Sequence, residues 1–420
     1  MVHGRVIRPP VAGATPVSVD ESSIKDIPGA KVVRDKDLLG VVADNEWNAI
    51  KAAQALKVEW SQAQPPFVDN AGAVYDHIRK APVRKRTVEK ENGNVDEAFR
   101  SAARVIEAEY EWPFQSHASM GPGCGVVAIN GDQATVWTGS PKPHYCRDGV
   151  AALLGMPADK VEAHSFAGSG AYGRNDAGEA CMEAAVLARA VGKPVRVQYM
   201  RSQGTGWDPK GPASIHRARA AVDASGKVVA YEYASKGFSR LDMNSNESKP
   251  WDVLAGHLLG VALKSGDAFG APAESYAFDN KRLSWETIAP LLDRASGKIW
   301  ARKFTVAHDC GQIINPNTLK QTIEGNVIQG TSRTLWEEVA LDRKNVTSVD
   351  WVTYPILDIT EAPQTIDVVL INHPELAPTG AGEPSSRPIA AAIGNAIFDA
   401  TGVRLRRVPF TPDKVRAAFS

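Results

Sequence analysis

A single glutamate, Glu383, stands in the glycine- and proline-rich stretch PTGAGEPSSRP, between Gly380, Gly382 and Pro384. Its backbone is restricted, and an apolar helix-like run follows directly. Two roles fit a carboxylate at this position: it caps the helix, or it is a general base that accepts a proton from a reacting group. A helix N-terminus lowers the pKa of a carboxyl group, whereas burial beside an anion raises it. A base here therefore needs an anionic neighbour that excludes water.

A second candidate is the stretch AGSGAYGRNDAGEA, in which Gly168, Gly170 and Gly173 have the spacing G-x-G-x-x-G. Such glycines permit a tight turn and let backbone N–H groups approach an anion at a helix N-terminus. A dinucleotide-binding fold also needs an acidic residue at the end of the next strand, but that strand ends in QYMRSQ, with Arg201. Three alternatives stay open: NADP bound through Arg201, a turn without a ligand, and another anionic cofactor.

The remaining candidate ligands do not form a recognised set. His308, Asp309 and Cys310 are adjacent, but neighbours in a strand point to opposite faces and no second His/Cys cluster completes a metal site. The four cysteines contain no C-x-x-C pair, which predicts no iron–sulfur cluster in this chain. His117 lies in a loop-like stretch, where a lone histidine is more often a hydrogen-bonding residue than a catalyst.

The charge balance limits the kind of partner. Lysine and arginine total 48, as do aspartate and glutamate, so no global field favours nucleic acid or an anionic membrane. The start, MVHGRVIRPP, lacks the layout of a signal peptide, and the longest apolar stretch is interrupted by His257 and glycines. These features predict no membrane span and a cytoplasmic location, with export alongside a partner as the alternative.

A mixed α and β framework must position these residues. Residues 1–62 read as a small α/β unit, with short β-rich runs before a helix that places Trp47, Ile50 and Ala53 at helical spacing. Residues 63–90 contain prolines and mixed charge and read as a linker. The length of 420 residues is typical of two or three domains.

Turn and helix signals divide the rest of the chain. Asn130-Gly131 between β-rich runs predicts a hairpin, and a second hairpin is expected around the turn at 223–227. Helices are predicted from about Ala177, along the segment that contains Ile323 and Val327, and in the run that ends at Gly402. The predicted fold class is therefore α+β.

One hairpin is unusual. The turn in DRASGKIWARKFTVAHD precedes a clear strand, but the residues before Ser296, LSWETIAPLLDRA, do not alternate like a strand. We therefore expect the first strand of this hairpin to be missing, and a segment to be absent near Ala295.

Three stretches, GSGAYGR, HDCGQIINPNTLKQTIEGNVIQG and GAGEPSSRPIAAAIGNAIFDATG, occur in this order behind the small α/β unit. Together they resemble the molybdenum-binding large subunit of the xanthine dehydrogenase and aldehyde oxidoreductase family, especially the bacterial isoquinoline 1-oxidoreductase and nicotinate dehydrogenase type. The resemblance implies a hammerhead-like domain over 1–62, the linker 63–90, a first molybdopterin-binding domain over 91–295 that is truncated at its end, and a second over 296–420.

The resemblance also assigns roles to individual residues. In relatives the glutamate of the G-x-G-E motif is the general base of a hydroxylation in which oxygen comes from water, and Glu383 matches it. Cofactor contacts carried over from the family are Gly168, Gly170, Ala171, Tyr172, Gly173, Gln329, Gly380, Ala381 and Gly382. The implied cofactor is molybdopterin cytosine dinucleotide, whose molybdenum is held through the pterin without a direct protein ligand.

The resemblance implies partners as well. Electrons would pass to a separate [2Fe-2S] subunit, with a cytochrome c as a further acceptor, and no iron–sulfur cluster or FAD is expected in this chain. The substrate class is an N-heteroaromatic or an aldehyde.

Three departures from the family pattern bear on activity. Pro141 stands where relatives usually carry a glutamine, and proline cannot make the hydrogen bond of that amide. The segment expected to be missing near Ala295 is the second departure, and a start inside the first small domain is the third. A catalytically inactive, abridged paralogue that keeps the fold and the partner surface is therefore an alternative to an active enzyme.

Overall fold

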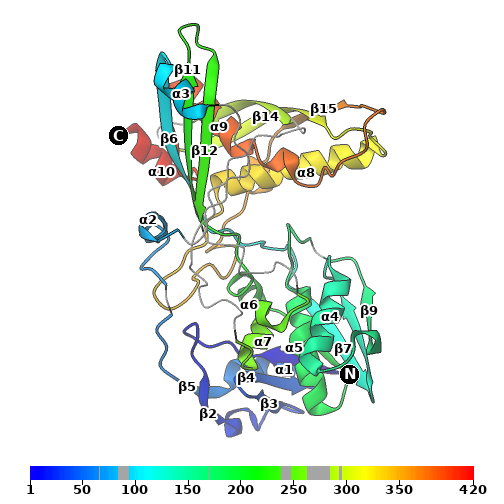
Figure 1. The fold of residues 1–420 in the computed structure, drawn as a ribbon. Coiled ribbons are helices and arrows are strands. Elements are labelled where there is room, and N and C mark those ends of the chain that lie inside the picture. The colour runs from blue at the N-terminus through cyan, green and yellow to red at the C-terminus, as the bar shows by residue number, and fades with distance from the viewer. Residues whose placement is uncertain (66, 84–93, 169, 238–246, 263–283, 293–295) are drawn as a thin grey trace.

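The computed structural model describes residues 1–65, 67–83, 94–168, 170–237, 247–262 and 296–420, and the backbone of 284–292. Figure 1 shows two lobes, which we call the lower lobe and the upper lobe after their places in that view. The lower lobe contains a seven-stranded sheet, and the upper lobe contains two three-stranded sheets.

The lower lobe is built on one mixed sheet with the strand order β3-β4-β1-β10-β7-β8-β9. Its strands are β1 (Val2–Val6), β3 (Lys31–Asp35), β4 (Leu38–Ala43), β7 (Cys124–Asn130), β8 (Gln133–Thr138), β9 (Val161–Ser165) and β10 (Val195–Gln198). The pair β7–β8 is the hairpin predicted from Asn130-Gly131. Strand β1 lies inside the sheet, antiparallel to β4 and parallel to β10. Residues 1–62 therefore share a sheet with residues 124–198, and the predicted domain boundary at residue 62 stays a prediction.

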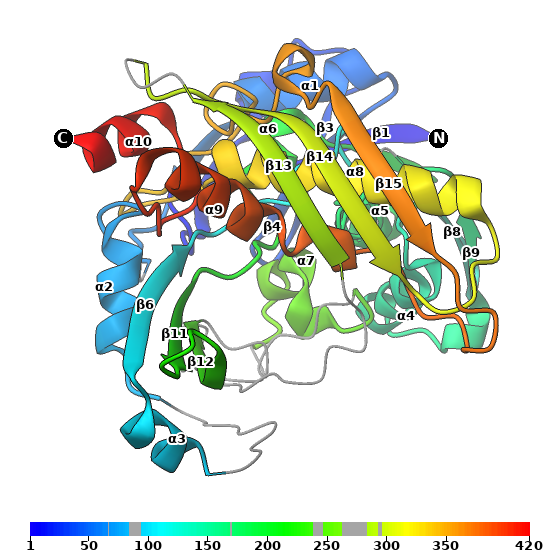
Figure 2. The ribbon, with the colours of Figure 1, turned by 90° about the horizontal axis from the view of Figure 1, so that it is seen from above.

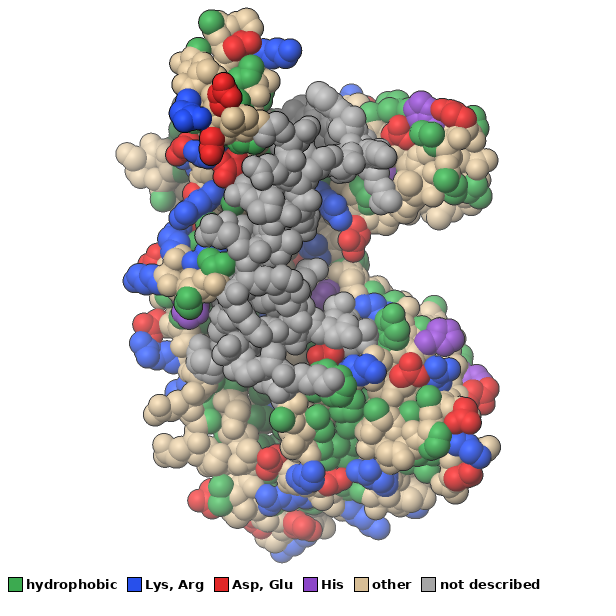
Figure 3. Space-filling model, in the orientation of Figure 1, with side chains coloured by type: hydrophobic (Ala, Val, Ile, Leu, Met, Phe, Trp, Pro, Cys, Tyr) green, Lys and Arg blue, Asp and Glu red, His purple; other side chains and the backbone are tan. Residues whose placement is uncertain are grey.

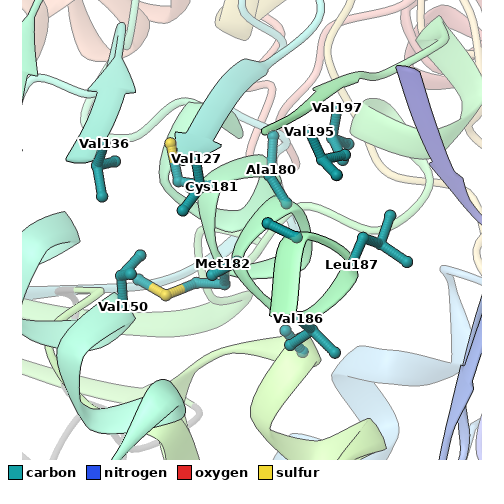
Figure 4. Packing of buried hydrophobic residues seen from close by; sticks show 14 of the residues in the cluster. Val127, Val136, Val150, Ala180, Cys181, Met182, Val186, Leu187, Val195 and Val197 are labelled. Carbon is teal, nitrogen blue, oxygen red and sulfur yellow. The ribbon is translucent and has the colours of Figure 1, made fainter. Parts of the chain in front are cut away.

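Helices cover both faces of this sheet. Strand β4 alternates, with Leu38 and Val42 in the core cluster beneath helix α5 (Ala177–Val191) and Leu39 and Val41 in the cluster beneath helix α1 (Glu46–Ala55). Because successive side chains of a strand point to opposite faces, α5 and α1 cover opposite sides. Figure 4 shows the α5 side, where aliphatic side chains of the helix meet those of the strands.

Smaller elements complete the lower lobe. They are β2 (Pro16–Asp20) and β5 (Lys57–Trp60), which pair with each other, and the helices α4 (Pro143–Leu154), α6 (Arg201–Thr205) and α7 (Leu254–Leu258). The side chain of Leu187 from α5 packs directly on the backbone of β1: a Cβ added at Gly4 would lie 2.6 Å from Cδ1 of Leu187. This small residue allows the helix to lie directly on the central strand.

The upper lobe contains a tall antiparallel sheet in the order β12-β11-β6. Its strands are β6 (Arg104–Trp112), β11 (Ser214–Val222) and β12 (Val228–Gly237), and helices α2 (Ala73–Lys80) and α3 (Val95–Ser101) lie beside it. Strands β11 and β12 form the hairpin predicted around 223–227. Helix α2 falls inside the segment predicted to be a linker, and its Tyr75 is buried.

The second sheet of the upper lobe has the order β13-β14-β15 and lies across helices α8 and α9 (Figure 2). Its elements are β13 (Ser284–Leu292), β14 (Ile299–Asp309), β15 (Thr365–Ile371), α8 (Pro316–Leu335), α9 (Ile389–Thr401) and α10 (Pro412–Phe419). Helix α9 ends at Gly402 in the left-handed conformation, as predicted.

The expectation of a missing strand before Ser296 is wrong. Strand β13 occupies 284–292 and pairs antiparallel with β14, with a register shift between Ala289 and Pro290. A bulge interrupts the alternation of side chains, and proline is tolerated because β13 is at the edge of its sheet. These two features hid the strand in the sequence. Ala295 itself lies outside the described residues.

Candidate functional site

The glycine-rich turn connects β9 to α5. Among the described residues of this turn, three have positive φ: Gly170 at +89°, Tyr172 at +48° and Gly173 at +110°. Glycine adopts this region without steric cost, whereas Tyr172 is held there by its surroundings. Phe166, just before the turn, and Tyr172 are 61% and 41% exposed, so the turn presents aromatic side chains and bare backbone to the outside.

A second loop lies directly against this turn. A Cβ added at Gly168 would lie 2.5 Å from the carbonyl oxygen of Gly139, and the Asn175 amide donates to that same oxygen at 2.9 Å. Pro141 follows two residues after Gly139 and is exposed. The two loops that the family resemblance connects with the cofactor are therefore adjacent.

A buried carboxylate that sequence reasoning did not identify holds the second loop. Glu247 is 1% exposed, and the Ser140 hydroxyl donates to its two oxygens at 3.0 and 3.2 Å. Glycine is required where Glu247 passes, because a Cβ at Gly178 of α5 would lie 2.3 Å from its Cδ. Burial raises the pKa of Glu247, although Arg174 lowers it. No short-range motif marks this residue, since its partners are more than 60 residues away.

Two more buried acids lie behind the turn. Burial, and then the neighbouring Asp208, raise the pKa of Asp176 to about 7. Burial also acts on Asp208, but Lys210 and hydrogen bonds from His117 and Ser116 bring the pKa of Asp208 below its ordinary value. Near the glycine-rich turn, one carboxyl group therefore has a raised pKa and the other a lowered pKa.

Glu383 lies on the exposed connection between β15 and α9. It precedes the short 3₁₀ turn η5 (Pro384–Ser386), and its side chain makes no capping hydrogen bond there; its backbone carbonyl accepts from Ser386. Helix α9 begins only at Ile389. Glu383 thus occupies the N-cap position of η5, but the alternative that its side chain caps the following helix is wrong, and its carboxylate is exposed.

The segment after Glu383 is fixed to α8. Asn326 of α8 donates to Ser385 at 2.9 Å in a buried contact, and a Cβ at Gly330 would lie 2.6 Å from Cγ1 of Ile389. Gln329, half-buried, is the neighbour of Gly330 on the same helix. The structure therefore fixes the η5 turn, which directly follows Glu383, to the helix that carries Gln329.

Gly380 and Gly382 differ from the glycines of the turn. Neither has positive φ, and a Cβ added at either would meet nothing within 4 Å. Neither the backbone conformation nor a neighbouring atom would exclude a side chain at these positions, so the space beside them is open. Open space beside backbone that carries no side chain is what a closely approaching ligand requires, so these residues fit a cofactor-lining role.

Two alternatives for other ligands are not supported. His308, Asp309 and Cys310 form no metal cluster, since the residues that the structure describes contain no group of three or more His, Cys, Asp or Glu suited to a metal ion. The NADP alternative is wrong, because β9 and β10 on either side of the turn are separated in the sheet by β7 and β8, and β10 is antiparallel to β7. Arg201 is already engaged: it donates to the carbonyls of Ser119 and Met120.

The described residues include no helix with both the length and the apolar character that crossing a bilayer requires.

The space-filling view in Figure 3 shows a hollow between the two lobes on the side away from β6 and β12.

Family models identify two regions of the chain. Each is described as a molybdopterin cofactor-binding domain, and they match residues 78–237 and 266–363. The first match contains the glycine-rich turn, and the second contains Gln329.

Curated relatives match nearly the whole chain. A nicotinate dehydrogenase subunit of Pseudomonas putida is 33% identical over 528 aligned positions, which cover 100% of this chain and 44% of that protein. The beta subunit of isoquinoline 1-oxidoreductase of Brevundimonas diminuta is 23% identical, over 98% of this chain and 64% of that protein. The chain thus spans less than two thirds of either relative. Since 420 residues are aligned over 528 positions, at least 108 positions of the Pseudomonas protein have no counterpart here.

Solved structures show the same fold. Quinoline 2-oxidoreductase from Pseudomonas putida 86 matches with a TM-score of 0.73 at 13% identity, over 99% of this chain and 94% of that chain. The aldehyde oxidoreductase from Desulfovibrio gigas matches with a TM-score of 0.74 at 15% identity, over 99% of this chain and 77% of that chain. With the domain matches and the relatives, the fold similarity gives one conclusion: this chain belongs to the family of molybdopterin cofactor-binding subunits of xanthine dehydrogenase and aldehyde oxidoreductase type.

Proposed function

We propose that the chain is the catalytic, molybdenum-cofactor subunit of a hydroxylating oxidoreductase that acts on an N-heteroaromatic compound or an aldehyde. The observation that carries the proposal is the pair of matches to molybdopterin cofactor-binding domains, of which the first contains the glycine-rich turn and the second contains helix α8. Relatives named as nicotinate and isoquinoline oxidoreductases support the substrate class. The cytosine dinucleotide form of the cofactor is part of the proposal.

Several groups of this chain fit the cofactor. The positive-φ turn at 170–173 offers backbone amides, and the glycines at 380 and 382 leave open space beside their own backbone. A bound molybdopterin would supply the two-electron redox chemistry and the activated oxygen. Ser140 and Glu247 hold the loop beside the turn, while the exposed Phe166 and Tyr172 would exclude water once a ligand covers them.

Glu383 carries out the proton transfer in this proposal. Its carboxylate is exposed and makes no capping hydrogen bond, so its acceptor oxygens are available to a reacting group. The neighbouring η5 turn, fixed to α8 through Ser385, restricts where the carboxylate can reach. A positioned general base of this kind contributes roughly 10²–10⁴-fold to a rate.

The proposal includes partners. The four cysteines of the sequence form no iron–sulfur cluster motif, so in this proposal electrons leave through a separate [2Fe-2S] subunit and then a cytochrome c or similar acceptor. A cytoplasmic location, or export together with a partner, is part of the same proposal.

A second candidate is favoured by a specific observation. The 108 or more positions that the chain lacks relative to the Pseudomonas protein, together with Pro141, suit an abridged paralogue that keeps the fold without turnover.

Metal analysis separates the two candidates. The chain is produced in a host that makes molybdopterin cytosine dinucleotide, purified with any co-purifying chains, and its molybdenum is measured by mass spectrometry. We expect about one molybdenum per chain for the catalytic subunit. A folded protein without molybdenum would exclude the catalytic proposal and support the abridged paralogue.

A further inference from the structure

His117 lies against the glycine-rich turn. A Cβ added at Gly173 would lie 3.3 Å from both Cδ2 and Nε2 of the His117 imidazole. The ring edge that carries Nε2 therefore occupies the space beside Gly173 that a side chain would take. The φ of +110° at Gly173 favours glycine, and a side chain there would also have to displace this imidazole slightly.

A buried carboxylate holds His117 in this place. Asp208, with a side chain that is only 5% exposed, accepts hydrogen bonds from the His117 backbone N–H at 3.0 Å and from the Ser116 hydroxyl at 2.6 Å. Lys210 forms an ion pair with the same carboxylate. The loop before the turn is thus anchored at two consecutive residues.

The two ring nitrogens of His117 have different surroundings. Nδ1 is buried and lies 3.8 Å from Oδ2 of Asp208, which is beyond hydrogen-bond length. Nε2 makes no hydrogen bond to any residue that the structure describes, and the side chain is 22% exposed. The next residue, Ala118, has a φ of +46°, a conformation that costs free energy and is retained only where the surroundings enforce it.

An imidazole with one edge facing a carboxylate and the other edge open is a positioned donor. The pKa of the Asp208 carboxyl lies below its ordinary value in spite of burial, so this anchor of the His117 backbone is a carboxylate. A hydrogen on Nε2 lies on the ring edge beside Gly173, where the side chain is partly exposed. The acceptor that suits it is an anionic oxygen lying on the turn.

We propose that His117 is a cofactor-contacting residue, whose Nε2–H donates a hydrogen bond to an anionic oxygen of the molybdopterin bound at the glycine-rich turn. This inference rests on the proposed function, since it concerns the same cofactor. Asp208 is a positioning residue in the proposal, because it acts on the cofactor only through His117.

The test compares His117→Phe, which keeps a ring and loses the donor, with His117→Gln, which keeps an N–H donor near the position of Nε2. His77→Gln, on helix α2 beside the other sheet, is the matched control. Molybdenum and phosphorus per chain are measured by mass spectrometry after purification and after prolonged dialysis, and thermal unfolding is recorded for cofactor-free protein. We expect His117→Phe to retain at most about a tenth of the wild-type molybdenum, and the other two variants to retain most of it.

The ¹⁵N resonance of the His117 Nε2, identified by its absence from the His117→Gln spectrum, provides a second measurement on the wild-type protein. It should differ between cofactor-free and loaded protein. Full molybdenum retention by His117→Phe would overturn the inference and leave the proposed function intact. If His117→Phe does not fold, an unchanged Nε2 resonance in the wild-type protein would overturn the inference in the same way. Absence of molybdenum from folded wild-type protein would instead overturn the proposed function, and this inference with it.

Discussion

Glu383 is exposed on the connection between β15 and α9, and its side chain is not used in capping. The carboxylate therefore contributes little to the stability of the fold, and a change of its charge should be tolerated. A loss of activity on substitution of Glu383 would therefore report on its chemical role and not on the stability of the fold.

Replacement of Glu383 by glutamine tests that role. Glutamine keeps the size of the side chain but cannot accept a proton, so turnover of the loaded complex should fall by about 10²-fold or more while molybdenum content stays unchanged. Steady-state kinetics and metal analysis measure the two quantities. Glu375→Gln, in the same connection, is the control and should keep its activity. A Glu383→Gln variant with wild-type turnover would exclude the general-base role.

Asp176 predicts a pH dependence of stability. Its pKa is raised by burial to about 7 in the folded protein, above the ordinary value of 3.8. The folded state therefore binds more protons than the unfolded state between about pH 4 and 7, and its stabilising contribution is lost as the pH rises through that window. The slope from one such group is at most about 1.4 kcal/mol per pH unit.

Asp176→Asn stays neutral at every pH and should remove this part of the slope. Urea unfolding at pH 5, 6, 7 and 8 measures it, and the variant should lose less stability than wild type between pH 5 and pH 8. The slope will not vanish, because burial also raises the pKa of Glu183 to about 7. A variant with the same slope as wild type would show that Asp176 is ionised in the folded state.

Among the elements, α8 offers a matched pair of glycines. A Cβ at Gly330 would lie 2.6 Å from Ile389 of α9, whereas a Cβ at Gly325 on the same helix would meet nothing within 4 Å. The close approach of α8 and α9 therefore depends on Gly330 and not on Gly325.

We expect Gly330→Ala to destabilise the protein by about 1–3 kcal/mol, because the side chain overpacks a buried contact. Gly325→Ala should stabilise it by about 0.5–1 kcal/mol, since alanine favours the helix. Chemical denaturation measures both free energies of unfolding. If the two variants behave alike, the close contact between α8 and α9 is not formed. Because Gly330 adjoins Gln329, Gly330→Ala should also lower the molybdenum content of the protein.

Elements with local signals could be predicted from the sequence. The hairpin at Asn130-Gly131, helix α5 and the stop of α9 at Gly402 each depend on residues that are near one another in the chain. Strand β13 could not be predicted, because Pro290 and the adjoining bulge break its pattern. The order of the seven strands also could not be predicted, since it depends on pairing between distant segments.

Some residues of the candidate site could likewise be predicted from the sequence, and others could not. Glycine spacing marked the turn at 168–173, and the G-x-G-E pattern marked Glu383. Glu247 carried no signal, because only the folded chain brings it to Ser140, 107 residues away. His117 was recognised in the sequence as a loop histidine, but its position beside Gly173 depends on Asp208, which lies 91 residues further along the chain.

For the whole molecule, the lower lobe depends on the first residues of the chain. Strand β1 lies between β4 and β10, and its removal would split the seven-stranded sheet and uncover Leu187 of α5. Deletion of residues 1–7 should therefore abolish cooperative unfolding of the lower lobe. Circular dichroism and limited proteolysis of the purified protein measure this outcome. A deletion variant that keeps a sharp unfolding transition would show that the sheet does not need β1.

The position of β1 also sets the order in which the protein can be completed during synthesis. Val2 pairs with Val195, so β1 leaves the ribosome about 190 residues before β10 is available. At roughly 5–20 residues per second, this interval lasts on the order of 10–40 s. Through that time one edge of β1 is unpaired in the nascent chain, and an unpaired edge is open to association with other chains. The seven-stranded sheet is thus completed only after β10 has been translated, and the nascent chain needs protection during this interval.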